Sequence, residues 1–211
     1  MKILLFLQYL SYFSSFLPLI GAIGYWYKKK FFFDSRVDLL GCYFILYSIT
    51  QNIMLILSLS GIHNLFILKI LAPIETFVFS FIVLSFQVKS KRLTFFLAFL
   101  FTLIVIIIDI AWGKPNTLPV ESLIVQSIVI TLIGMSAIPS IRIKKDYESA
   151  FFYFIFGILF SSVNTLLGVG FIELAPELSY NIQAIINIIS YSIFAWGFYV
   201  IFKSESEIKK Q

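Results

Sequence analysis

One carboxylate, Glu75, lies near the middle of the apolar stretch KILAPIETFVFSF, residues 69–81. A carboxylate in hydrocarbon can bind a cation, carry a proton or accept hydrogen bonds, and it needs a partner because an unpaired buried charge is costly. The predicted span 64–88 places Glu75 about 16 Å from the nearer membrane surface, so its side chain cannot reach water there. We therefore expect Glu75 to meet a donor from another helix or to be protonated, and we predict that it lines a ligand-binding site.

Lys69 is the second charged residue of the same stretch. It lies about five residues from the outer end of the span, so its ammonium group can extend to the lipid headgroups or pair with Asp109 near the outer end of the next span. Two charges cost about 5 to 7 kcal/mol on an insertion scale, about as much as the apolar residues of this span supply. The span should therefore be an inner helix of a bundle.

Three prolines are candidates for hinges or kinks. Pro73 removes the amide that would bond the Lys69 carbonyl, which predicts a kink one turn before Glu75. A carbonyl freed beside an acid suits a cation or a polar solute, and a kink that serves only packing is the alternative. Pro18 and Pro139 lie near the inner ends of two other predicted spans.

Amide side chains recur at a similar depth in the other predicted spans. With Glu75 they predict a polar pocket in the outer half of the bundle, and the alternative is hydrogen bonding between helices, worth about 0.6 to 2 kcal/mol per bond. The residues are Gln51 and Asn52 in the second span, Gln126 in the fifth, Asn164 in the sixth, and Gln183 and Asn187 in the seventh, with Gln8, Tyr9 and Tyr12 in the first.

The motifs of several enzyme classes are missing from the sequence. The single histidine, His63, and the single cysteine, Cys42, provide neither an HExxH metal site nor a disulfide. No GxSxG, Walker A or Rossmann pattern occurs, and the last span has no lysine for a retinal Schiff base. We expect no catalytic residues, no metal site and no cofactor, and we predict that the protein is not an enzyme.

The composition predicts an all-α membrane bundle without a soluble domain. The chain has 211 residues, of which 60% are hydrophobic and 13% charged, and apolar runs long enough to cross a bilayer recur along it. We predict one domain, residues 1–211, with seven transmembrane helices. The predicted spans are 3–25, 37–60, 64–88, 93–112, 119–140, 149–171 and 180–202, followed by a short tail, 203–211.

The basic residues predict the orientation of these spans. Alternate connecting segments, together with the tail, carry most of the lysine and arginine in short clusters, which are typical of topological anchors and not of a nucleic-acid surface. The positive-inside rule then places the N-terminus outside and the C-terminus in the cytoplasm. We expect a multi-pass protein of the plasma (inner) membrane that contacts the lipid bilayer and binds no nucleic acid.

A weak repeat suggests two related halves. Asn52 and Asn164 are 112 residues apart, as are Glu75 and Asn187, which fits three spans, one linking span and three spans. This arrangement and the outward N-terminus resemble the topology of SWEET-type sugar facilitators and the wider PQ-loop group. No PQ dipeptide occurs, and the second and sixth spans contain no proline, so the resemblance is one of topology and not of family.

Three functions follow from these observations. The first is a facilitator or proton-coupled carrier of a small polar solute, with the pocket as its binding site. The second is a seven-helix sensor or receptor that signals to a separate cytoplasmic partner. The third is a structural or assembly subunit of a membrane complex, in which the polar residues only join helices and the partner is another membrane protein.

Overall fold

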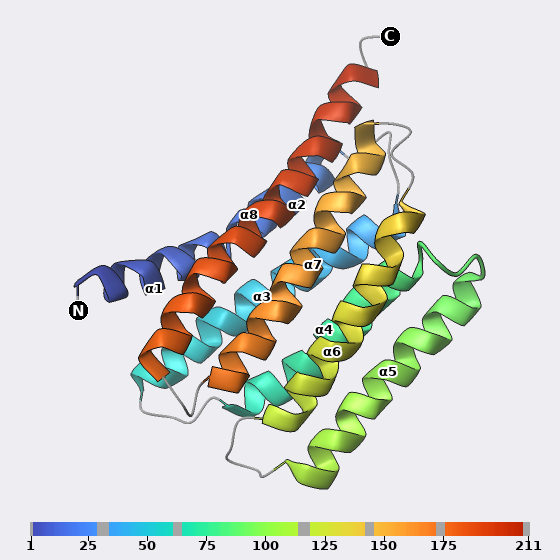
Figure 1. Ribbon diagram of the computed structural model, residues 1–211. Helices are drawn as coiled ribbons and strands as arrows, with labels where there is room; N and C mark the ends of the chain where they lie inside the picture. Colours follow the sequence, from blue (N-terminus) through green and yellow to red (C-terminus); the bar gives the residue numbers. More distant parts are fainter. Residues whose placement is uncertain are drawn as a thin grey trace.

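The computed structural model describes residues 2–28, 34–60, 65–113, 119–141, 146–171 and 176–208. All regular secondary structure in these residues is helical, which confirms the predicted all-α class for this part of the chain. The helices are α1 (Lys2–Ser14), α2 (Leu17–Lys28), α3 (Ser35–Leu59), α4 (Leu65–Leu84), α5 (Lys91–Trp112), α6 (Val120–Ala137) with the short 3₁₀ helix η1 (Ile138–Ser140), α7 (Asp146–Phe171) and α8 (Pro176–Ile208). Helices α3 to α8 correspond to the six predicted spans that begin with 37–60 (Figure 1).

The first predicted span, 3–25, is divided into α1 and α2 by a turn at Ser15 and Phe16. The Ser15 hydroxyl donates to the Tyr12 carbonyl at 2.6 Å, and Pro18 has no amide with which to continue the helical bonds of α1. Figure 1 shows α1 leaving the bundle at an angle to α2. The two helices have 13 and 12 residues, so each extends about 20 Å and is too short to cross about 30 Å of hydrocarbon alone. A seventh span therefore stays a prediction.

The outer surface of the helices is apolar. Among the residues that the structure describes, six helical segments are long and apolar enough to cross a membrane, and α5 illustrates how they are built. Small side chains of α5 face the bundle, whereas large ones face outward, which is the pattern of a helix in contact with lipid. The inward residues are Thr94, Ala98, Thr102 and Val105, and the exposed ones include Phe95, Phe96, Phe99, Ile107 and Ile110. The chain is a multi-pass integral membrane protein.

Six helices form a closed ring. Helix α2 packs on α3, α3 on α4, α4 on α6, α6 on α7, α7 on α8, and α8 returns to α2. Helix α5 lies outside this ring and packs against α4 and α6 (Figure 1). Helix α1 also lies outside it and packs mainly against α8. The ring therefore surrounds side chains from several helices, and these are the side chains that can form a common site.

Aromatic rings fill the core of this ring. The Phe44 and Phe194 ring centroids are 4.9 Å apart, and those of Phe154 and Phe198 are 5.0 Å apart. Helices α7 and α8 can approach closely because glycines face these rings: a Cβ atom added at Gly197 would lie 2.5 Å from Cε1 of Phe154. Small residues of this kind let membrane helices pack backbone to backbone.

Adding a methyl group at Gly197 should destabilise the bundle. In Gly197→Ala the new Cβ overlaps Phe154, and overpacking of this kind costs about 1 to 3 kcal/mol. Gly24 is the matched control, since a Cβ there meets Phe202 at an ordinary 4.0 Å, and Gly24→Ala should be neutral or gain up to about 1 kcal/mol of helix propensity. Thermal unfolding in detergent measures both, and equal melting temperatures for the two variants would contradict the close packing of α7 and α8.

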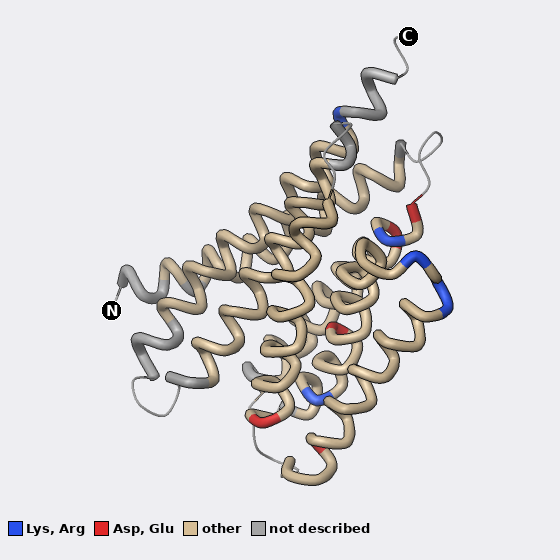
Figure 2. The backbone as a smooth tube through the Cα atoms, turned by 45° about the vertical axis from the view of Figure 1, so that its right-hand side comes forward, with Lys and Arg blue, Asp and Glu red and all other residues tan. Residues whose placement is uncertain are grey.

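Basic residues mark one end of the bundle. In Figure 2 the blue segments lie mainly at the end that holds the α4–α5 connection, and one lies in the other half. We call this end, where α3 and α5 begin and α4 and α8 end, the basic end, and we call the opposite one the distal end. Arg36, Lys89, Lys91 and Arg92 belong to the basic end, whereas Lys69 lies near the start of α4 at the distal end. The cytoplasmic orientation of the basic end stays a prediction.

Candidate functional site

A cavity of about 630 Å³ lies inside the helix ring. Its wall combines one carboxylate with phenol, hydroxyl and amide groups on an apolar background, as is common in sites for small molecules. The lining residues are Tyr43, Phe44, Tyr47, Gln51 and Met54 of α3, Leu68, Leu71, Glu75 and Phe79 of α4, Leu123 of α6, Ser161, Asn164, Thr165 and Val169 of α7, and Gln183, Asn187, Tyr191 and Phe194 of α8.

Glu75 receives its hydrogen bond from a tyrosine. The Tyr43 hydroxyl donates to Oε2 of Glu75 at 3.1 Å, and Tyr43 is buried. Four residues farther along α3, the Tyr47 hydroxyl is hydrogen-bonded to that of Tyr191 on α8. Residues 43, 47 and 51 share one face of α3 because a helix turns once every 3.6 residues. Tyrosines of α3 thus join the carboxylate of α4 to α8 across the cavity.

These tyrosines were missed in the sequence, although a signal for them existed. The predicted pocket combines amides and one acid with Tyr9 and Tyr12 of the first span, and it does not include Tyr43, Tyr47 or Tyr191. The spacing of Tyr43, Tyr47 and Gln51, at four-residue intervals, would have placed all three on the same face as soon as Gln51 was assigned to the pocket.

Two amides of the opposite wall bond to each other. Asn164 Nδ2 donates to Oδ1 of Asn187 at 2.8 Å, which links α7 to α8. Asn164 is buried, and its own Oδ1 accepts from no residue that the structure describes. A buried acceptor of this kind ordinarily has a partner, so Asn164 contributes one unsatisfied polar atom to the region around the cavity.

Gln183 reaches the cavity wall because α7 has a glycine beside it. A Cβ atom added at Gly168 would lie 1.5 Å from Nε2 of Gln183. No residue larger than glycine leaves space for the glutamine side chain in this position. The predicted site residues Glu75, Gln51, Asn164, Gln183 and Asn187 are therefore brought to one cavity.

Asn52 and Gln126 are not brought to this cavity. Asn52 is exposed, and its Oδ1 accepts from the Tyr12 hydroxyl of α1 at 2.7 Å. The physical reason is the helical turn: adjacent residues point about 100° apart, so that Gln51 faces the cavity and Asn52 faces α1. Gln126 is buried in α6 but does not line the cavity.

The other predicted residues lie apart from the cavity wall. Lys69 Nζ is 3.6 Å from Oδ1 of Asp109, so the structure brings this pair together between α4 and α5. Helix α4 is continuous through Pro73. Pro18 follows the turn that divides α1 from α2, and Pro139 lies exposed in η1 at the end of α6, where it ends a helix and does not kink one.

Comparison with known proteins gives no relative for this arrangement. Protein-family models, curated proteins and solved structures contain no match to the chain. Within the described residues, no group of three His, Cys, Asp or Glu could hold a metal ion. The described side chains of the cavity wall offer hydrogen bonding by phenols and amides around the Glu75 carboxylate.

Proposed function

We propose that the protein is a carrier of a small polar solute in the plasma (inner) membrane and that Glu75 couples transport to a proton. The observation that carries this proposal is the cavity inside the ring, where Glu75, three tyrosines and four amides lie within membrane-crossing helices. Polar groups at this depth cost insertion energy, and they are typical of substrate and ion pathways.

The immediate surroundings of Glu75 support proton coupling. Its described partner is a neutral hydroxyl, Tyr43, and no lysine or arginine occurs among the described lining residues. A carboxylate without a cationic partner in a poorly solvated site is strongly favoured to take up a proton or to bind a cation. Release of that proton on the other side of the membrane would link movement of the solute to the proton gradient.

An aromatic layer supports alternating access. Phe79 and Phe194 are the lining residues of α4 and α8 nearest the basic end, Phe44 lies beside Tyr43 on that side of the α3 lining, and each of the three phenylalanines is 1% exposed. Their rings pack together, with centroids 4.9 Å apart for Phe44 and Phe194 and 6.1 Å apart for Phe79 and Phe194. These rings would close the cavity toward the basic end, so a carrier cycle would require them to separate.

The order of helix contacts supports two related halves. If α2, α3 and α4 correspond to α6, α7 and α8, then the α2–α8 and α4–α6 contacts are equivalent, and both occur. Helix α5 would be the linker outside the ring. The side chains depart from this symmetry at Asn52, which faces α1, whereas its counterpart Asn164 faces the cavity.

Ligand screening of the purified protein tests the proposal. Sugars, amino acids, nucleosides and small cations are added one by one, and thermal unfolding is followed in detergent. A ligand at about one hundred times its dissociation constant should add about 2.7 kcal/mol of stability. The compound found is then tested for uptake into proteoliposomes. Binding without any uptake would refute the carrier, and the absence of any stabilising compound across these classes would favour a structural subunit.

Asn164→Ala should weaken binding of the compound found in this screen, whereas Asn52→Ala should not. Asn164 lines the cavity, and losing one hydrogen bond to a ligand costs about 0.5 to 1.5 kcal/mol, or up to about tenfold in affinity. Asn52 is the matched control because it has the same side chain outside the cavity. Isothermal titration of both variants measures the difference, and equal affinities would remove Asn164 from the site.

A sensor is the second candidate, because α8 projects beyond its apolar segment. That segment ends at Lys203, but α8 continues as a helix through Ile208, past the other helices at the basic end (Figure 1). A projecting helix of this kind could hold a cytoplasmic partner. Ligand binding that changes recovery of a partner, without flux of the ligand, would favour this function over the carrier.

A further inference from the structure

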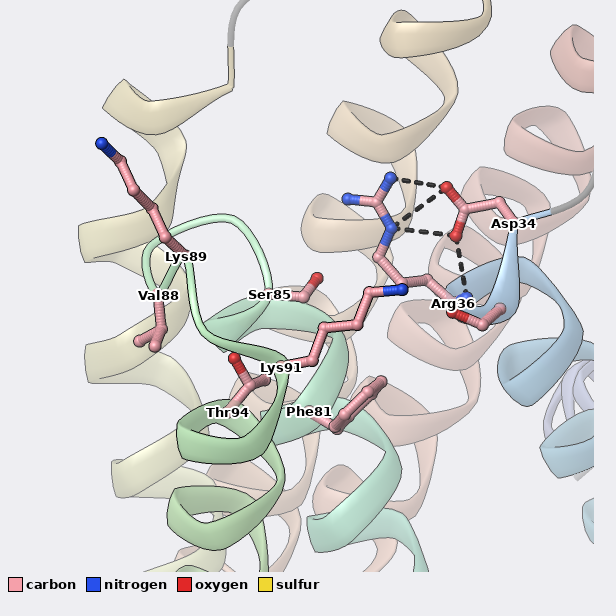
Figure 3. Close-up of a pocket in the computed structure, with 9 residues that line it drawn as sticks. Asp34, Arg36, Phe81, Ser85, Val88, Lys89, Lys91 and Thr94 are labelled. Carbon is pink, nitrogen blue, oxygen red and sulfur yellow. Dashed lines mark hydrogen bonds and ion pairs between the residues drawn. The ribbon is translucent and has the colours of Figure 1, made fainter.

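A second cavity, of about 400 Å³, lies at the basic end between the start of α3, the end of α4 and the start of α5 (Figure 3). It is separate from the polar cavity of the ring, since no lining residue is shared. Three cationic side chains, Arg36, Lys89 and Lys91, line it, and Asp34 is its one described acidic residue. The described wall therefore has an excess of two positive charges.

Arg36 is fixed in position at this cavity. Its Nε and Nη2 donate to the Asp34 carboxylate at 2.9 and 2.5 Å. The guanidinium plane lies over two aromatic rings, with Cζ 4.6 Å from the Phe86 centroid and 4.1 Å from the Phe151 centroid. Contacts of this type hold an arginine by cation–π attraction as well as by hydrogen bonds. Nη1 donates to no described residue, so a preorganised donor is available to an anion.

Lys91 supplies a second cation from the other wall. In Figure 3 its side chain extends from the first turn of α5 toward Arg36, whereas Lys89 points away from both. The hydroxyls of Ser85 and Thr94 donate to the carbonyl oxygens of Ile82 and Ser90. Arg36 and Lys91 therefore offer cationic donors to a ligand, and cationic donors favour anionic oxygen over a neutral solute.

We propose that this cavity binds a phosphate group, carried either by a membrane lipid or by a soluble phosphate. The remaining N–H groups of the Arg36 guanidinium and the Lys91 ammonium, on facing walls, can both bind phosphate oxygens. The cavity lies where membrane-crossing helices end, and basic pockets between such helices hold anionic headgroups. Phe81 and Val88 add an apolar part to its wall, which suits the glycerol and first acyl carbons of a lipid.

Thermal unfolding with two kinds of probe tests this proposal. The purified protein in neutral detergent receives short-chain phosphatidic acid, phosphatidylcholine of the same chain length, or inorganic phosphate at matched ionic strength. Phosphatidic acid should stabilise the protein more than phosphatidylcholine does. Stabilisation by the lipid alone identifies a headgroup as the ligand, whereas equal stabilisation by inorganic phosphate identifies a soluble phosphate. No stabilisation by either phosphate probe would overturn the proposal.

Substitutions at two neighbouring residues distinguish specific binding in the cavity from nonspecific attraction by surface charge. Lys91→Gln should reduce the apparent affinity for the stabilising probe by about tenfold, the effect of about one charge-assisted hydrogen bond. Arg92→Gln is the matched control, because Arg92 is exposed beside Lys91, is absent from the cavity wall and loses the same charge. An equal loss of affinity in both variants would overturn the proposal in favour of nonspecific attraction.

Discussion

Liposomes that contain the wild-type protein are expected to concentrate its solute about tenfold under a pH gradient of one unit, because one unit corresponds to about 1.36 kcal/mol per proton. Liposomes that contain Glu75→Gln should instead level off at equal concentrations inside and outside. Glutamine keeps the size and hydrogen-bonding ability of the protonated acid but cannot release a proton. Exchange of labelled for unlabelled solute at equal pH should continue in the variant, since the cavity wall is otherwise unchanged.

Glu121→Gln is the control for this experiment. Glu121 is an exposed carboxylate in the first turn of α6, outside the cavity wall, and the substitution makes the same chemical change. It should accumulate solute like the wild type. Accumulation by Glu75→Gln at the wild-type level would show that Glu75 does not couple to protons. Equilibration without accumulation in the wild type as well would identify a facilitator.

Gly168→Ala is expected to remove Gln183 from the cavity wall and to weaken ligand binding together with stability. The added Cβ would lie 1.5 Å from Nε2 of Gln183, so the glutamine must leave its position or α7 and α8 must separate. Overpacking of this kind costs about 1 to 3 kcal/mol of unfolding free energy. Thermal unfolding with and without the ligand measures both effects on the same sample.

The double variant Gly168→Ala with Gln183→Ala distinguishes packing from binding. Shortening Gln183 removes the atoms that would overlap, so the melting temperature should recover toward that of the wild type. Ligand binding should remain weak, because the amide is still missing from the wall. A single Gly168→Ala variant with unchanged melting temperature and affinity would contradict the close approach of Gly168 and Gln183.

Hydropathy was sufficient to predict most of the fold. Runs of apolar residues between charged segments correspond to α3 through α8 because the bilayer requires a minimum apolar length. The break between α1 and α2 was not predicted, because hydropathy carries no information about backbone hydrogen bonds. Ser14, Ser15 and Pro18 provided the local signal: two hydroxyls that bond preceding carbonyls, followed by a residue without an amide.

The residue types of the site could be predicted from the sequence, but the direction in which each side chain points could not. Polarity alone selects Gln51 and Asn52 equally, although only Gln51 lines the cavity. The difference arises from the rotation of α3, in which Gln51 faces the cavity and Asn52 accepts a hydrogen bond from Tyr12 of α1. Hydropathy could not show that Tyr12 and Asn52, 40 residues apart, are neighbours. The basic cavity was likewise hidden, because its cations were interpreted as topological anchors.

The pairing of Lys69 with Asp109 bears on the order in which the chain is assembled during synthesis. The pair joins α4 to α5, the next helix to leave the ribosome, so both charges can be neutralised within one helical hairpin before α6 exists. The bond between Tyr47 and Tyr191 spans 144 residues and must wait for α8. Contacts between distant parts of a chain form late because their loops are costly to close. The Tyr43–Glu75 bond between α3 and α4 and then the Lys69–Asp109 pair are thus the early polar contacts of α4, and the binding cavity is completed only when the nascent chain is nearly finished.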